Sequence, residues 1–161
     1  MKGDPKVINC LKEVLKGELA AINQYFLHAE MCANWGYQSL AAYTKKEAIE
    51  EMRHAEALIE RILFLESLPN LKEMFPLHIG KDVKAQIEND LALELQAVPR
   101  LNDAIKVSVT AGDNASRDLF ERILKDEEVH VDWLEAQLGM IKEMGLGIYL
   151  SQQMKEEKGE G

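Results

Sequence analysis

Six residues of this sequence have the side chains and the spacing that two neighbouring metal ions would need. Four of them form two Glu-x-x-His motifs, which place a carboxylate and an imidazole on one face of a helix. Two further glutamates each precede the glutamate of a motif by 33 residues. The complete set is Glu18, Glu51, His54, Glu94, Glu127 and His130. The last three are the same residue types as the first three, each at a distance of 76 residues along the chain.

The neighbours of these glutamates predict that the carboxylates are buried. Glu18, for example, is flanked at helical spacing by Val14, Leu15, Ala21 and Ile22, and no Lys or Arg lies one turn from any of the four. Burying an ionised carboxylate without a partner costs free energy, and no basic side chain is placed to pair with these four. Two divalent metal ions would neutralise the four negative charges, and two iron ions fit this requirement. The alternative is a helical protein with hydrogen-bonded buried glutamates, which a single motif would favour but the repeated set does not.

Helical periodicity and end signals predict the elements that carry these residues. Asp4 before Pro5 indicates one helix start, and Ser39 is the expected cap of another. The predicted helices are 5–35, 39–67, 82–111, 114–143 and a short 146–155. The stretch 67–81 has no helical pattern and is long for a link between antiparallel neighbours. We therefore predict an all-α, ferritin-like four-helix bundle with one long crossover and a short C-terminal fifth helix, a fold whose known di-iron ligand pattern matches this set.

Length and composition limit the kind of protein. The 161 residues fit a single domain, 1–161, and 47% hydrophobic with only 6% aromatic residues favours helices. A net charge of -9 without a basic block argues against nucleic-acid and membrane partners. No apolar run is long enough for a membrane span or leader, so a cytoplasmic protein is expected. Cys10 and Cys32 are expected to be reduced packing residues, and His28 and His78 ordinary ones.

Several stretches resemble the bacterioferritin family along nearly the whole chain. They include ELAAINQYFLHAEM at 18–31, EEMRHA at 50–55, RILFLESLPNL at 61–71 and DEEVHVDWLE at 126–135. The resemblance implies that Glu51 and Glu127 bridge two irons, that Glu18 and Glu94 are terminal ligands, and that each histidine binds one iron. It also implies a homo-oligomeric cage of twenty-four subunits with ferric mineral inside, haem b shared between two subunits, and a ferredoxin-type reductase for iron release.

Two residues near the motifs leave alternatives open. The resemblance implies that Met52 is an axial ligand of haem b. Helical geometry turns Met52 about 100° away from Glu51, onto a second apolar stripe with Ile49 and Ile59, so packing at a subunit interface is the alternative. Tyr25 lies two turns after Glu18, where its phenol could donate a hydrogen bond to a metal ligand or pass an electron to bound oxygen species. The alternative is a packed tyrosine whose hydroxyl is satisfied by a hydrogen bond. We assign it no catalytic role.

The sequence departs from its apparent relatives at an inner-surface iron site. Some relatives have histidine at position 46 and aspartate at position 50, whereas this chain has Lys46 and Glu50.

Pro99 lies inside the third predicted helix, where it removes a backbone hydrogen bond, so a kink or bulge is predicted near Leu95.

The expected function is iron storage and detoxification. Ferrous iron would be oxidised by dioxygen or hydrogen peroxide at the di-iron centre within one subunit, and the ferric product stored in the hollow cage. A di-iron oxygenase or reductase subunit is one alternative, but the short chain offers little for a substrate channel and no rubredoxin-like Cys-x-x-Cys pair. A non-catalytic, DNA-protecting cage is the other, and the lack of a basic tail speaks against it.

Overall fold

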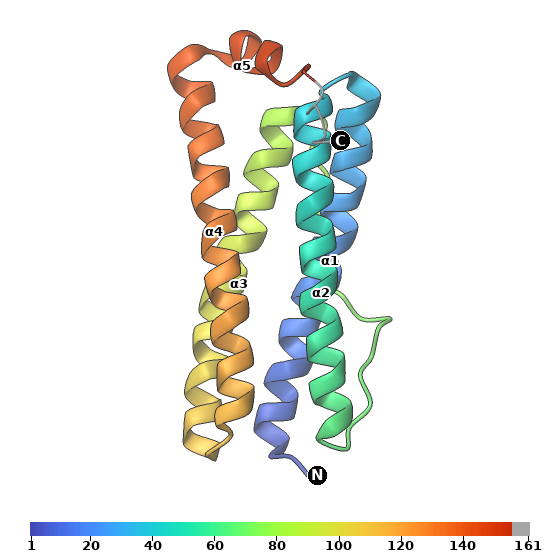
Figure 1. Ribbon diagram of the computed structural model, residues 1–161, viewed down its shortest axis with the longest axis vertical. Helices are drawn as coiled ribbons and strands as arrows, with labels where there is room; N and C mark the ends of the chain where they lie inside the picture. Colours follow the sequence, from blue (N-terminus) through green and yellow to red (C-terminus); the bar gives the residue numbers. More distant parts are fainter. Residues whose placement is uncertain (156–161) are drawn as a thin grey trace, which may run out of the picture.

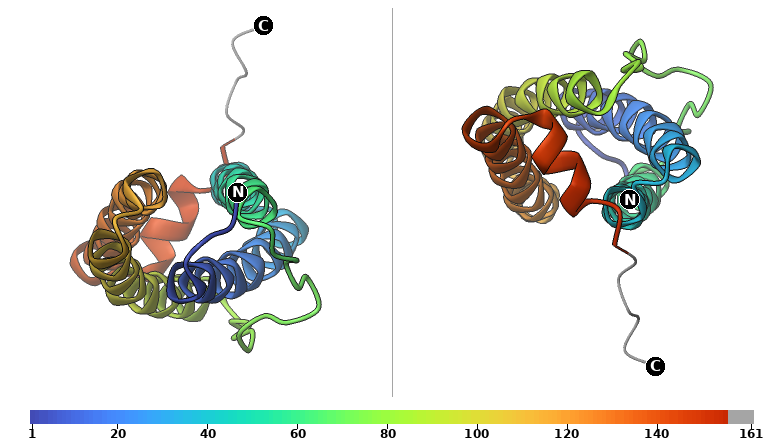
Figure 2. Two further views of the ribbon diagram at one scale, coloured as in Figure 1. Left: turned by 90° about the horizontal axis from the view of Figure 1, so that it is seen from below. Right: turned by 90° about the horizontal axis from the view of Figure 1, so that it is seen from above.

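The computed structural model describes residues 1–155, and these residues contain five α-helices (Figure 1). The helices are α1 (Pro5–Trp35), α2 (Gln38–Phe64), α3 (Val83–Ala111), α4 (Asn114–Met144) and α5 (Leu146–Gln152). The first four form a bundle and α5 lies across one end of it (Figure 2). The predicted all-α bundle with a long crossover and a short fifth helix is confirmed.

Short turns make the helices antiparallel pairs. α1 ends at Gly36, whose φ of 90° is a left-handed conformation that glycine adopts without strain, and α2 begins two residues later. Gly112, with φ of 71°, does the same between α3 and α4. The segment 65–82 then returns along the outside of the first pair to start the second (Figure 1). Two similar helical pairs are thereby placed side by side.

A buried polar network holds the end of this crossover against the bundle. The Gly80 N–H donates to His28 Nε2 at 3.0 Å, so the ring proton is on Nδ1 and is donated to Asp90 Oδ1 at 2.9 Å. Gln24 Nε2 donates to the same oxygen at 2.8 Å. A Cβ at residue 80 would lie 2.2 Å from Gln86 N, so the approach requires glycine. His28, which lies outside the predicted ligand set, has a structural role here: it fixes the crossover to α1 and α3.

The structure corrects the predicted bounds of α2. Ser39 is not its cap: the helix begins at Gln38, and the Ser39 N–H donates to the Gln153 carbonyl at 3.0 Å. A backbone carbonyl from the C-terminal segment therefore satisfies this first-turn donor. At its other end the helix stops at Phe64, not at residue 67, because Glu66 turns into the left-handed region with φ of 61°.

The remaining helix ends differ little from the prediction, and α5 ends at Gln152 where 155 was expected. Asp4 caps α1 as expected, its side chain accepting from the Lys6 N–H at 2.8 Å. Pro99 lies inside α3, which remains helical from Val83 to Ala111. The bend or bulge near Leu95 stays a prediction.

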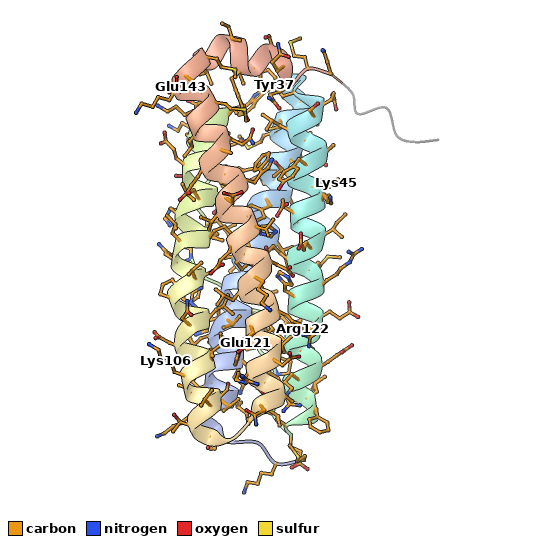
Figure 3. All side chains as sticks on the ribbon, turned by 60° about the vertical axis from the view of Figure 1, so that its left-hand side comes forward. Tyr37, Lys45, Lys106, Glu121, Arg122 and Glu143 are labelled. Atoms are coloured by element: carbon orange, nitrogen blue, oxygen red, sulfur yellow. The ribbon has the colours of Figure 1, made fainter. Side chains whose placement is uncertain are left out.

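Two large apolar clusters form most of the core and leave a polar layer between them, beside a third, small cluster around Tyr25. The larger cluster lies at the end of the bundle where α1 begins and includes Leu11, Leu58, Ile62, Leu101 and Phe120. The smaller one lies toward α5 and includes Leu40, Ile87, Leu134, Ile141 and Tyr149. Side chains fill the space between the helices, while charged ones such as Lys45 and Lys106 lie on the outside (Figure 3). The two clusters hold the four long helices in register around the polar layer.

Candidate metal centre

All six predicted ligand residues are buried in the middle of the bundle. α1 and α3 each contribute one glutamate, and α2 and α4 each contribute a Glu-x-x-His motif. Their exposed fractions are at most 7%: Glu18 4%, Glu51 0%, His54 7%, Glu94 0%, Glu127 1% and His130 3%. They lie where apolar side chains continue the helical stripes above and below, as the sequence predicts.

The six side chains form two overlapping groups. Glu18, Glu51, His54 and Glu127 offer ligand atoms that all lie within 4.8 Å of one another, and so do Glu51, Glu94, Glu127 and His130. Glu51 and Glu127 belong to both groups, whereas the other four residues belong to one each. Two shared carboxylates between two sites are the geometry that a pair of bridged metal ions requires.

Both histidines direct the same ring nitrogen into this centre. His54 Nδ1 lies 3.0 Å from Glu127 Oε1, 3.4 Å from Glu51 Oε2 and 3.5 Å from Glu18 Oε2. His130 Nδ1 lies 3.0 Å from Glu51 Oε1, 3.4 Å from Glu94 Oε1 and 3.5 Å from Glu127 Oε2. The two halves therefore mirror each other in space, as the 76-residue repeat does in sequence.

The buried atoms of the centre fit a metal better than a hydrogen-bond network. Within residues 1–155, both Nδ1 atoms and at least one oxygen of each of the four glutamates are buried without a hydrogen-bond partner. Such orphaned groups are rare in proteins, and here they converge on one place. Carboxylate oxygens and imidazole nitrogens together suit iron and similar divalent ions. The donor set therefore fits two such ions.

In the absence of metal, protons would have to relieve the repulsion between the carboxylates. Burial raises the pKa of Glu18 well above its ordinary value, and the charges of Glu51 and Glu127 raise it further. The pKa of Glu94 is raised in the same way. Burial alone would lower the pKa of His54, but close contacts with the carboxylates of Glu127, Glu18 and Glu51 outweigh burial and raise the pKa. Metal binding must displace these protons.

The outer nitrogens of the two histidines are held by carboxylates that the sequence reasoning missed. Asp126 Oδ2 lies 2.8 Å from His54 Nε2, and Glu50 Oε2 lies 3.2 Å from His130 Nε2. Asp126 and Glu50 are again 76 residues apart, each directly before the glutamate of a motif, which is the signal that could have revealed them. Glu47 also contacts His130 Nε2 and has no counterpart in the other half. Such partners fix the ring orientation and the proton position of a metal-binding histidine.

The remaining singled-out residues fall near the centre or on its borders. The Tyr25 hydroxyl donates to Glu94 Oε1, so the tyrosine holds a ligand and its own hydroxyl is satisfied. At the inner-surface position, Glu50 groups with His54 and Asp126 within 4.8 Å, and Lys46 borders the opening that they line.

Met52 lies apart from the centre, on an exposed apolar face. Its side chain is 56% exposed and Ile49 beside it is 41% exposed. Leu19 and Ile22 of α1 and Leu71 of the crossover line the same shallow groove. An apolar face with a solvent-accessible thioether is compatible with a flat apolar ligand bound between two copies of the chain.

Comparison with known proteins decides the family. The Ferritin-like domain family matches residues 8–144. Bacterioferritin from Mycolicibacterium paratuberculosis is 47% identical over 152 residues, which are 94% of this chain and 96% of that protein. The chain belongs to the bacterioferritins. Bacterioferritin from Mycobacterium avium is 46% identical over the same shares, and that from Streptomyces coelicolor is 47% identical over 94% of this chain and 90% of its own length.

Membership of the bacterioferritins supports a role in iron storage and is consistent with iron oxidation; proteins of this family form oligomeric cages. In the described part of the chain, no helix is long and apolar enough to cross a membrane.

Proposed function

We propose that this bacterioferritin oxidises ferrous iron at an intrasubunit di-iron centre and stores the ferric product inside a hollow cage. The observation that carries the proposal is the pair of four-residue groups that share Glu51 and Glu127. One shared carboxylate could arise in any crowded core. Two shared carboxylates with one histidine and one further glutamate on each side give two equivalent sites at bridging distance.

The residues of the chain bind and neutralise the iron. Four carboxylates match the charge of two ferrous ions, so the filled centre is close to neutral despite its burial. Glu51 and Glu127 hold the two ions together, while Glu18 with His54 and Glu94 with His130 complete one site each. Two adjacent ferrous ions would each lose one electron and become ferric. Together with two protons from solvent, these two electrons would reduce hydrogen peroxide to two water molecules, or dioxygen to hydrogen peroxide. Asp126 and Glu50 keep the Nδ1 atoms of the two histidines available as ligands.

The supporting residues also set the resting state of the centre. Because the pKa values of Glu18 and Glu94 are raised, both carboxyls take up protons when iron leaves. Those protons are released when the next pair of ferrous ions binds. Tyr25 stays close to Glu94 through its hydroxyl and keeps that carboxylate oriented. The centre is therefore preorganised for repeated filling.

We further propose that Met52 binds haem b together with the Met52 of a second subunit. The exposed thioether and the apolar groove formed by Leu19, Ile22, Ile49 and Leu71 support this proposal. When bound, haem would supply a redox centre at the subunit interface.

The wider proposal is a homo-oligomeric cage of twenty-four subunits in the cytoplasm, supplied with Fe(II) and with dioxygen or hydrogen peroxide. Each chain would form one domain over 1–161, of which the last six residues lie outside the described range. A ferredoxin-type reductase is proposed for iron release. The many exposed apolar side chains, among them Phe64, Leu68 and Ile148, support burial between subunits.

The ferroxidase proposal is tested by stopped-flow absorbance after mixing the metal-free protein with two ferrous ions per subunit in air. The wild type should give a rapid ferric signal, and Glu127→Gln should abolish it because both sites lose a shared ligand. Glu128→Gln, which changes the next and exposed residue of α4, serves as the matched control and should keep the wild-type rate. A Glu127→Gln protein that oxidises iron at the wild-type rate would remove the assignment.

A further inference from the structure

A small void lies behind the metal centre on the side of α1 and α3. Glu18, Glu51 and Glu127 line it together with the small residues Gly17 and Ala97. Its volume is about 10 Å³, room for one molecule the size of water. Ala97 and Ala21, which also lines the void, are corresponding residues of the two 76-residue halves. Because Glu51 and Glu127 belong to both four-residue groups, the void borders ligands of both, and Glu18 places it nearest the group that contains His54.

The side chain of Arg100 covers this void at Gly17. Residue 17 has no side chain, and the space where its Cβ would lie is filled by Arg100 Nη1 at 2.6 Å. The Arg100 guanidinium in turn stacks on the ring of Phe75 in the crossover, with 4.3 Å between Cζ and the ring centroid. The Phe75 N–H donates to the Lys16 carbonyl at 3.5 Å, which keeps the crossover beside this position. Arg100, supported by Phe75, thus covers the void at Gly17.

The charges on the two sides of the centre differ. On the α1–α3 side an approaching solute meets the Arg100 guanidinium, with the Glu13 carboxylate close to it. Burial lowers the pKa of Arg100, but the ordinary pKa of arginine is so high that the side chain stays protonated. On the α2–α4 side it meets Glu47, Glu50 and Asp126, all in contact with the outer nitrogens of the histidines. Lys46 and Arg53 also line that opening, but the groups nearest the imidazoles are carboxylates. The Arg100 guanidinium therefore repels a divalent cation on the α1–α3 side, and the carboxylates on the α2–α4 side attract one. Neither set of charges acts strongly on an uncharged molecule.

We propose that the void behind Gly17, closed by Arg100 over Phe75, is the route by which the small uncharged oxidant reaches the metal centre, and that ferrous iron does not use it. The inference rests on the proposed ferroxidase function and adds to it the residues that separate the two substrates. Arg100 acts as a gate: its long side chain swings aside for dioxygen or hydrogen peroxide, and its charge keeps cations out.

Two substitutions act on this route in opposite directions. Ala97→Leu fills the void with a larger side chain, whereas Arg100→Gln shortens the cover and removes its charge. Ala92→Leu makes the same change as the first variant at an exposed position of α3 and is the matched control. Neither Ala97 nor Arg100 is among the proposed ligands, so the affinity and number of bound Co(II) ions should not change.

The experiment loads each protein with two ferrous ions per subunit without oxygen and then mixes it with hydrogen peroxide or dioxygen in a stopped-flow instrument. The second-order rate constant for the oxidant should fall about tenfold in Ala97→Leu, rise several-fold in Arg100→Gln and stay at the wild-type value in Ala92→Leu. If Ala97→Leu no longer binds Co(II), its metal centre is disturbed, and the rate constant of Arg100→Gln alone then tests the proposed route.

The failure of this proposal differs from the failure of the ferroxidase function. A wild type that binds two ferrous ions but does not oxidise them refutes the function, and the route with it. A wild type that oxidises iron rapidly, with a rate constant that neither Ala97→Leu nor Arg100→Gln changes, refutes the route alone.

Discussion

Replacing Glu18 with glutamine should make the metal-free protein more stable while it disables one metal position. The carboxyl group is 4% exposed, and burial together with the charges of Glu51 and Glu127 raises its pKa. Each unit of such a shift corresponds to about 1.4 kcal/mol, and replacing buried charges by neutral groups of similar size is commonly stabilising by a few kcal/mol. We therefore expect Glu18→Gln to raise the free energy of unfolding of the metal-free protein by about 1–3 kcal/mol at pH 8.

The sign of the pH dependence follows from the raised pKa. Below the ordinary pKa of 4.5 the carboxyl is protonated in both the folded and the unfolded chain, so it contributes no difference. As the pH rises through and above 4.5, the unfolded chain ionises first and the folded wild type loses stability relative to it. Glutamine does not ionise. The advantage of Glu18→Gln should therefore be small at pH 5 and larger at pH 8.

Thermal unfolding in the presence of a chelator measures this effect. For a chain of this length about 1 kcal/mol corresponds to roughly 2–4 °C in Tm, so a rise of about 2–12 °C is expected at pH 8. Co(II) titration should show one tight site in place of two, because a unit charge at about 4 Å contributes roughly 4 kcal/mol, or about a thousandfold in Kd. Glu30→Gln, an exposed position on the same helix, should change neither quantity. A lower Tm at pH 8, or two unchanged Co(II) sites, would refute the reasoning.

Four other results are expected. Asp126→Asn should weaken Co(II) binding about 10–100-fold, because His54 loses the carboxylate at Nε2; Asp132→Asn, on the exposed face of α4, is the control in the same titration. The metal-free wild type should lose Tm as the pH rises above 6.5, because the raised pKa of His54 means that its stabilising charge is fully present only below the unfolded value; a Tm that rises from pH 6.5 to 9 would contradict this. Met52→Leu should abolish the Soret absorbance of protein purified with added haem while Met140→Leu keeps it, and a Soret band in both would exclude Met52 as the ligand. Phe120→Ala should cost about 3–5 kcal/mol in chemical denaturation because Phe120 is fully buried, and an unchanged midpoint would show that the core packs differently.

The sequence predicts the bundle and the ligand set well because both depend on local periodicity. Helix faces follow from the 3.6-residue repeat, so a glutamate within an apolar stripe, such as Glu18 or Glu94, has to point inward. The same logic places Glu51 and Glu127 one turn from a histidine. Predicting that these side chains are buried requires only that the helices pack together, and the arrangement of the helices does not have to be known.

Contacts between helices far apart in sequence were beyond such reasoning. Asp126 and Glu50 are partly exposed and belong to no apolar stripe, so only their 76-residue spacing marks them in the sequence. Which histidine each one contacts appears when α2 and α4 are placed side by side. Arg100 comes from α3 and reaches over Gly17 of α1, a contact fixed by the packing of the two helices and the path of the crossover. His28 lies outside the repeated ligand pattern, and its partners, Asp90 and the Gly80 N–H, are more than 50 residues away in the sequence.

The end of α2 shows the limit of local end signals. Ser39 is a favourable cap residue by type, but the chain begins the helix one residue before it. The reason is tertiary: the carbonyl of Gln153, after α5, reaches the Ser39 N–H and takes the place of a side-chain cap. A cap supplied by another segment leaves no trace in the local sequence.

The most direct test of ferroxidase-linked storage is aerobic addition of ferrous iron to the metal-free protein, followed by size-exclusion chromatography with detection of protein, ferric iron and mass in the same peak. The account predicts that ferric iron in large excess over two per subunit elutes with a particle far heavier than the 18.2 kDa chain, and that Glu127→Gln elutes at the same size with little of it. Iron that is oxidised rapidly but elutes apart from the protein would contradict storage and favour an oxygenase-type use of the same centre.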